Sequence, residues 1–203
     1  MTSVEKRGFT LIELLIVVAI ISILAALAVP NFLAARTRSQ VSRARADMRT
    51  IVTALESYRV DNMDYPTYHY ADVDQAALEF HIGGRVPAFN VPDPDWDGRN
   101  PLTTPIAYLT SFPQDPFARL REGPPEVRQY LYVNWRYAIE RVGRPQFVLM
   151  RQAYGDFRLH SRGPNQYGPE PGVPYDPTNG TISDGDITYG PNTGFDKFVP
   201  LPF

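Results

Sequence analysis

Apolar side chains run almost without interruption from Phe9 to Val29, and a different pattern follows. Leucine, isoleucine, valine and alanine dominate this run, whose length matches the about 20 apolar residues that a helix needs to cross a bilayer core. Beyond Pro30, apolar residues recur every three or four positions with polar residues between them, as in an amphipathic helix. A proline inside a helix kinks it without necessarily ending it. We therefore predict one helix over 9–62, transmembrane over 9–29 and amphipathic over 30–62.

Residues 63–203 are rich in proline, glycine and aromatic side chains, and they predict a globular head. Before its strands we expect a short helix over Asp72–His81 and a loop over Gly83–Asn100. From residue 161 to 203 the chain lacks periodicity, which predicts a long C-terminal loop. The fold class is therefore α+β, a ladle in which one long helix packs on a small antiparallel sheet. Aromatic and branched residues bounded by turn signals predict the strands Tyr130–Ile139, Phe147–Gln152 and Phe157–His160.

The composition argues against several functions. Lysine and arginine number 20 against 22 aspartates and glutamates, so no basic field marks nucleic acid as the main partner. The chain has no cysteine, which excludes a disulfide framework, a thiolate zinc site and a cysteine nucleophile. The three histidines show no metal-ligand spacing, and the sequence contains neither a serine-hydrolase motif nor a phosphate loop. We therefore expect that the chain is not an enzyme.

Glu13 is a carboxylate inside the apolar run, and it is the most informative residue of the chain. A charged carboxylate at the centre of a membrane helix costs about 2.5–3.5 kcal/mol on insertion scales. Such a residue indicates a functional site by default, and its partner has to be found. The alternative is a simple membrane anchor in which Glu13 is protonated or extends to the membrane interface.

A basic pair and a small residue, Lys6-Arg7-Gly8, precede the apolar run, which reverses the order found in a secretory signal peptide. Together with Phe9-Thr10-Leu11-Ile12-Glu13, these residues resemble the prepilin leader of type IV pilins and of type II secretion pseudopilins. The resemblance implies that residues 1–8 are a leader, that a prepilin peptidase cleaves between Gly8 and Phe9, and that Phe9 is then N-methylated. It also implies that Glu13 pairs with the N-terminal ammonium of a neighbouring subunit, so that Phe9 and Glu13 are assembly residues.

The resemblance is strongest to the major pseudopilin of type II secretion systems, a fibre-forming structural subunit that drives protein export. It implies a precursor held in the inner membrane by a single span, with a periplasmic or otherwise extracytoplasmic head, which then polymerises into a periplasmic pseudopilus. The implied partners are copies of the same chain, minor pseudopilins or pilins, the prepilin peptidase and methyltransferase, the inner-membrane assembly platform and, before assembly, membrane lipid.

Two other functions stay open. A surface type IV pilus, serving adhesion, motility or DNA uptake, carries the same N-terminal motif, with this chain as its major or minor subunit. The alternative from a different class is a single-pass anchored ectodomain that binds a ligand or acts as an enzyme. The orientation also involves a conflict, because the positive-inside rule would place the arginines after the span in the cytoplasm, whereas the resemblance places them outside. These residues are Arg36, Arg38, Arg43 and Arg45.

Two stretches of the C-terminal loop resemble the calcium-binding segments of major pseudopilins. One begins at Ser161, and the other is Ser183-Asp184-Gly185-Asp186-Ile187. The resemblance implies calcium ligands at Asp184, Asp186 and Ser161, and calcium takes about six to eight oxygen ligands. Asn165 stands where the family has an aspartate, and residues 166–180 form an insertion. The alternative is that the two aspartates only cap turns.

Overall fold

The computed structural model describes residues 9–66, 101–118, 130–143, 145–166, 175–176, 178, 183 and 185–195. The leader 1–8, the predicted helix Asp72–His81, the predicted loop Gly83–Asn100 and the candidate ligand Asp184 lie outside these ranges. The described elements form the expected α+β architecture. They are α1 Leu11–Asn62, β1 Leu131–Asn134, α3 Trp135–Val142, α4 Pro145–Tyr154, β2 Phe157–Ser161, β3 Ile187–Gly190 and β4 Gly194–Phe195.

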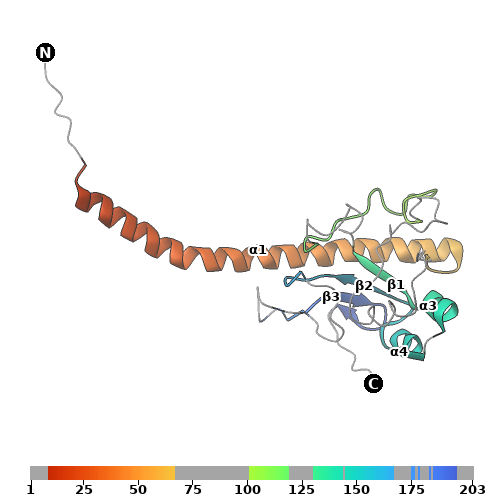
Figure 1. Ribbon diagram of the computed structural model, residues 1–203. Helices are drawn as coiled ribbons and strands as arrows, with labels where there is room; N and C mark the ends of the chain where they lie inside the picture. The colour runs from red at the N-terminus through yellow and green to blue at the C-terminus, as the bar shows by residue number, and fades with distance from the viewer. Residues whose placement is uncertain are drawn as a thin grey trace, which may run out of the picture.

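Helix α1 is continuous over 52 residues, which confirms the predicted long helix. Thr10 caps its start, and Met63, in the left-handed conformation at φ 61°, ends it. Pro30 lies inside the helix, and the helix curves in the half that contains it (Figure 1). This first half projects away from the head, whereas the second half lies along the sheet (Figure 1).

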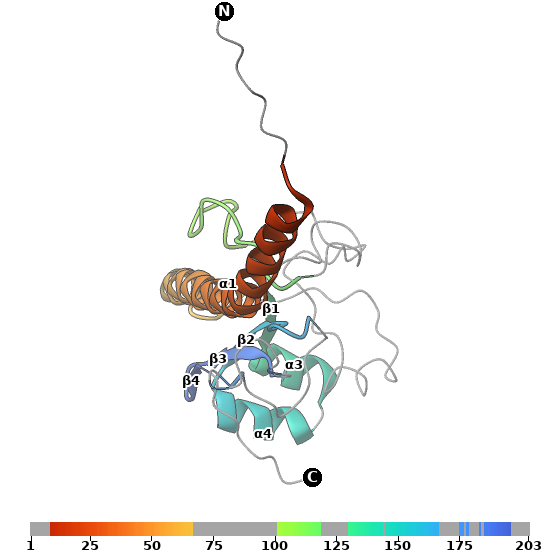
Figure 2. The ribbon, with the colours of Figure 1, turned by 90° about the vertical axis from the view of Figure 1, so that its left-hand side faces the viewer.

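The four strands form one antiparallel sheet in the order β1-β2-β3-β4. The sheet lies between α1 on one face and helices α3 and α4 on the other (Figures 1 and 2). Because side chains alternate across a strand, β2 directs Phe157 and Leu159 toward α1 and Arg158 and His160 toward the opposite face. All the residues of β2 are buried, since both of its faces are covered.

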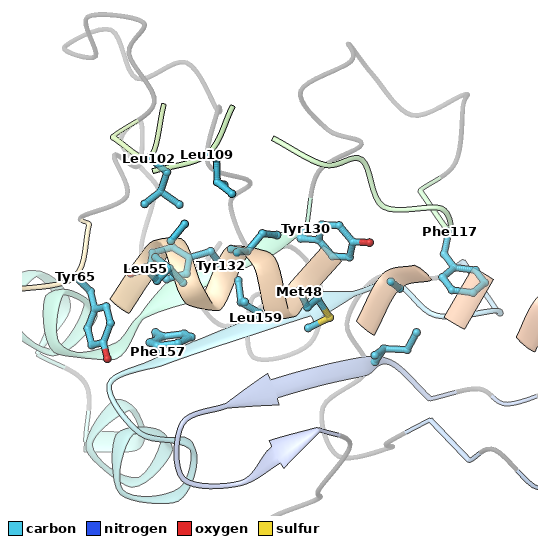
Figure 3. Packing of buried hydrophobic residues seen from close by; sticks show 14 of the residues in the cluster. Met48, Leu55, Tyr65, Leu102, Leu109, Phe117, Tyr130, Tyr132, Phe157 and Leu159 are labelled. Atoms are coloured by element: carbon cyan, nitrogen blue, oxygen red, sulfur yellow. The ribbon is translucent and has the colours of Figure 1, made fainter. Parts of the chain in front are cut away.

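The main core forms where the amphipathic half of α1 meets the sheet (Figure 3). Met48, Ile51 and Leu55 are fully buried on the α1 side of this core. Phe157 joins them from β2, and its ring centroid lies 4.9 Å from that of Tyr65, which follows the end of α1. The apolar stripe predicted for the second half of the helix is therefore the surface that holds the head.

Residues 101–118 cover α1 on the side away from the sheet (Figures 1 and 2). Leu102 and Leu109 enter the main core from this side, and the N–H of Leu109 donates to the carbonyl of Leu102 at 2.8 Å. The hydroxyl of Tyr108 donates to Asp61 Oδ2 at 2.7 Å near the end of the helix. The helix is thus enclosed from two sides, which explains why residues at positions 44, 48, 51 and 55 are completely buried.

The structure corrects the predicted strands. Strand β1 ends at Asn134, whose side-chain oxygen accepts a hydrogen bond from the N–H of Tyr137 at 3.1 Å and thereby caps α3. Gly143 ends α3 at φ 70°, and Pro145 occupies the first position of α4. The predicted strand Phe147–Gln152 is therefore helical. Strands β3 and β4 lie in the stretch that the sequence predicts as loop.

Candidate functional site

The first half of α1 exposes its large apolar side chains. This part of the helix is long and apolar enough to cross a membrane, and none of it is buried in the structure. Leu11, Ile12 and Leu27, for example, are 81%, 65% and 66% exposed. A water-soluble surface rarely carries so continuous an apolar patch, so this half of the helix requires lipid or other subunits around it.

Glu13 and Thr10 form a capping box at the start of α1. Glu13 Oε2 accepts hydrogen bonds from the Thr10 N–H at 2.8 Å and from the Thr10 hydroxyl at 2.6 Å. The Glu13 N–H in turn donates to the Thr10 hydroxyl oxygen at 3.3 Å. The box satisfies backbone donors that a helix start leaves open, and it places negative charge where the helix dipole favours it. Both hydrogen bonds that the carboxylate accepts use Oε2, so Oε1 meets no donor among the described residues.

Phe9 directly precedes this capping box and is 74% exposed. Gly8, on the other side of the predicted cleaved bond, lies outside the described residues. Phe9 and Glu13 therefore occupy the same end of α1, at the tip farthest from the head (Figure 1). A carboxylate at this tip is accessible to the end of another chain.

The arginines after the span divide into two groups. Three of them contact other residues of the chain: Arg43 forms an ion pair with Asp47 at 3.7 Å, and Arg45 and Arg49 lie over the rings of Tyr175 and Phe195 at 5.7 Å and 5.3 Å. Arg36 and Arg38 are exposed and make no ion pair within the described ranges. Most of the positive charge after the span is thus engaged within the chain, by Asp47 of the same helix and by two aromatic rings of the head.

Asp115 joins residues 101–118 to the end of β2, a contact that sequence reasoning missed. Its Oδ1 accepts hydrogen bonds from the Ser161 hydroxyl at 2.8 Å and from the Phe117 N–H at 2.9 Å. Its Oδ2 accepts a hydrogen bond from the Arg162 N–H at 3.0 Å. Asp115 is only 5% exposed, and this burial raises the pKa of its carboxyl above the ordinary value, although the hydrogen bonds oppose the shift.

The candidate calcium ligands Ser161 and Asp186 are not brought together. Ser161 pairs with Ile187 across the sheet, and Ile187 belongs to the core on the α1 face. Asp186, one residue earlier, lies on the opposite face, where its Oδ2 is 4.0 Å from Nδ1 of His160. The described residues contain no group of three or more histidine, aspartate or glutamate side chains arranged to hold a metal ion. Ser161 and Asp186 thus point to opposite faces of the sheet.

Asp186, His160 and Arg158 form a buried polar group on this opposite face. Burial lowers the pKa of His160 well below its ordinary value, and the nearby Arg158 charge lowers it further, so His160 is neutral at neutral pH. Burial also lowers the pKa of Arg158, whose guanidinium lies 4.4 Å from the ring centroid of Tyr154 and attracts Asp186. The positive charge of Arg158 thus already attracts the negative charge of Asp186.

The two stretches of the C-terminal loop nevertheless lie against each other. Gly163 adopts φ +65°, and a Cβ atom at this position would come within 2.5 Å of the carbonyl oxygen of Gly185. Glycine adopts this conformation readily, and because it has no Cβ atom it alone permits so close an approach. The backbone of the first stretch therefore contacts the backbone of the second.

Comparisons with known proteins agree with this geometry. Residues 5–29 match the prokaryotic N-terminal methylation motif, and residues 31–71 match type II secretion system protein G. The first match covers the exposed apolar half of α1 with Glu13, and the second begins where the amphipathic half follows. No solved structure matched significantly.

Several curated relatives are similar to part of this chain. The type II secretion system core protein G of Pseudomonas aeruginosa is 34% identical over 113 residues, which cover 56% of this chain and 69% of that protein. The type II secretion system core protein G of Escherichia coli is 40% identical over 63 residues, 31% of this chain and 43% of that protein. The type IV major pilin protein PilA of Myxococcus xanthus is 56% identical over 54 residues, 27% of this chain and 24% of that protein. The chain thus spans less than half the length of the last two relatives, and about two thirds of the first. The chain belongs to the family of type II secretion system protein G, the pseudopilins.

Proposed function

We propose that the chain is a structural subunit of a type II secretion pseudopilus, assembled from the inner membrane to drive protein export. The observation that carries the proposal is the bare apolar half of α1, which starts at the Thr10–Glu13 capping box and projects away from a folded head. In the membrane this half spans the bilayer, with the head on the periplasmic side. In the fibre the same surface packs against the apolar halves of neighbouring copies, and the heads form the outside.

The capping box supplies the charge that orders this packing. After cleavage between Gly8 and Phe9, each subunit has an N-terminal ammonium at the same end of the helix as Glu13. Opposite charges in an apolar medium attract more strongly than in water, so an ammonium from a neighbour offsets the cost of the buried carboxylate. Thr10 holds Glu13 through Oε2, which leaves Oε1 for this intermolecular pair. Because only a correctly staggered neighbour can reach Glu13, the pair sets the register of the fibre.

Processing should leave a mature chain that begins with N-methylated Phe9. Peptide mass mapping of the protein isolated from its own cells should find no peptide that contains residues 1–8 and an N-terminal peptide heavier by one methyl group. The partners in this step are a prepilin peptidase and methyltransferase, followed by the inner-membrane assembly platform and minor subunits. Mature protein that retains Met1 would contradict the proposal.

A second candidate function is a surface type IV pilus. It is favoured by the 56% identity to the Myxococcus xanthus major pilin over 54 residues, 27% of this chain. That similarity covers a short segment, whereas the similarity to the Pseudomonas aeruginosa protein reaches over 56% of the chain, so we favour the pseudopilus. Immunogold labelling of intact cells distinguishes the two, since a surface pilus is labelled outside the cell and a periplasmic pseudopilus is not.

Calcium binding by the C-terminal loop is a separate proposal, which rests on the contact between Gly163 and Gly185 and on the resemblance of the two stretches. The ligands would be Asp184, Asp186 and backbone carbonyls of these stretches, without Ser161, whose hydroxyl donates to Asp115. Calcium at 100 times its dissociation constant stabilises the protein by about 2.7 kcal/mol.

Chelation of the full-length protein in detergent should therefore lower the melting temperature by about 5–10 °C. Asp184→Ala should remove this effect of chelation, whereas Glu140→Ala, a change on the exposed face of α3, should retain it. Identical melting temperatures with calcium and with chelator would leave the two aspartates as turn residues.

A further inference from the structure

A bare section of α1 separates the apolar span from the head. We call residues 30–40 the collar: Val29 ends the apolar run, and Val41 is the first residue of α1 that the head buries. Arg36 and Arg38 are the only charged residues of the collar. Both are exposed, and neither makes an ion pair with any described part of the chain.

The spacing along the helix sets the height of these arginines above the membrane. With a rise of about 1.5 Å per residue, the Cα atoms of Arg36 and Arg38 lie about 10 and 13 Å beyond Val29. The headgroup layer on each side of a bilayer is about 5–8 Å thick. Helix side chains tilt toward the N-terminus, and a long arginine side chain extends its charge back toward the membrane. The two guanidinium groups therefore reach the level of the lipid phosphates.

The positions around the helix indicate what kind of partner surrounds the collar. Two residues along a helix correspond to a rotation of about 200°, so Arg36 and Arg38 point to nearly opposite sides. A protein partner that docks on one face of the helix would meet only one of them, whereas a lipid leaflet surrounds the helix completely. Phe32 and Leu33, nearer to the span, are 67% and 48% exposed, as expected for side chains that face acyl chains.

We propose that Arg36 and Arg38 bind the phosphate groups of anionic lipids in the leaflet on the head side and so fix the height of the head above the membrane before assembly. The planar guanidinium matches a phosphate through two parallel hydrogen bonds, and neither arginine has a carboxylate in the collar to compete for it. The inference rests on the proposed membrane span. It gives the two arginines that remain outside the head a role on the side where the positive-inside rule does not expect them.

A local fluorescence measurement on the full chain in vesicles tests this proposal. Because the chain has no cysteine, Ala35→Cys allows a single fluorophore to be attached to the collar. Quenching of this fluorophore is compared between two kinds of vesicle. In one, phosphatidylglycerol carries the quenching label on its tail, and in the other, phosphatidylcholine carries the same label. Each arginine near an anionic surface contributes about fivefold to local binding, so phosphatidylglycerol should quench at least about fivefold more effectively. Arg36→Gln with Arg38→Gln should bring the ratio close to one.

Arg43→Gln is the matched control, since it removes the same charge from a residue that already pairs with Asp47. The control should keep the preference for phosphatidylglycerol. If Arg43→Gln also loses the preference, the effect comes from the overall positive charge of the helix and not from a site at Arg36 and Arg38, which contradicts the proposal. A ratio near one in the parent protein would overturn the proposal and favour acidic groups of a neighbouring subunit. Co-sedimentation with the vesicles is measured first: failure to sediment contradicts the membrane span itself, while an inserted chain without a lipid preference overturns only the lipid site.

Discussion

Asp115→Ala is expected to lower the free energy of unfolding of the head by about 3–5 kcal/mol, because it leaves three donors without their acceptor. These donors are the Ser161 hydroxyl and the backbone N–H groups of Phe117 and Arg162. Asp115 is 5% exposed, so water does not readily replace the lost carboxylate. Chemical denaturation of the full-length protein in detergent, followed by circular dichroism, measures the change.

Two further variants separate the contributions of the individual bonds. Asp115→Asn keeps one carbonyl oxygen for Ser161 and Phe117 but turns a donor toward the Arg162 N–H, so it should cost about 1–3 kcal/mol. Ser161→Ala removes a single hydroxyl and should cost about 1 kcal/mol. If Asp115→Ala cost no more than Ser161→Ala, the carboxylate would not connect the two segments as the structure indicates.

The same carboxylate also gives stability a dependence on pH. Burial raises the pKa of Asp115, so the folded protein holds this proton more tightly than the unfolded chain does. The free energy of unfolding that this group contributes is therefore greatest below the unfolded pKa of about 3.9 and falls as the pH rises through the folded pKa. Asp115→Asn should remove this part of the pH dependence.

The long helix could be predicted because its pattern is local. A continuous apolar run followed by a three- to four-residue repeat requires no knowledge of distant residues. Met48, Ile51 and Leu55, on that repeat, are among the residues that the head buries completely. The Gly8-Phe9 motif and Glu13 were equally readable, since they depend on adjacent residues alone.

The region of α4 could not be predicted from its composition. Phe147–Gln152 contains aromatic and branched residues that suit a strand, yet the chain folds there as a helix, with Phe147 and Met150 buried one turn apart. Pro145 at the first position was a usable signal for a helix start, and Asn134 was a usable capping signal for α3. This segment is helical because it packs against the face of the sheet opposite α1.

The role of Asp115 depended on register, which the sequence does not reveal. Ser161 lies on the α1 face only because β2 pairs with β3 in the register that places Ser161 opposite Ile187. A shift of β2 by one residue would turn Ser161 to the face on which Asp186 lies and would turn His160 to the α1 face. Reasoning from resemblance alone grouped Ser161 with Asp186, whereas the structure pairs it with Asp115, 46 residues earlier in the chain.

Glu13→Ala is expected to abolish incorporation of the subunit into fibres, with at least about a tenfold loss, while the precursor still inserts into the membrane and is cleaved. A charge pair at about 4 Å contributes about 4 kcal/mol at an effective dielectric constant of 20, and each subunit in the fibre would lose one such pair. Fibres sheared from cells that produce the variant alone are quantified against membrane-bound subunit by immunoblotting. The head should be unaffected, because Glu13 lies at the far tip of α1 (Figure 1).

Glu13→Gln isolates the charge, because glutamine also closes a capping box with Thr10 and preserves the helix start. It should assemble as poorly as Glu13→Ala. Thr10→Ser keeps the hydroxyl that holds Oε2 and should assemble normally, whereas Thr10→Ala, which removes it, should reduce assembly without abolishing it. Normal fibres from Glu13→Gln would show that the capping geometry, and not the charge, is what assembly needs from this position. If both Glu13 variants assemble poorly and Thr10→Ser assembles normally, the negative charge of Glu13 is what sets the register between neighbouring helices.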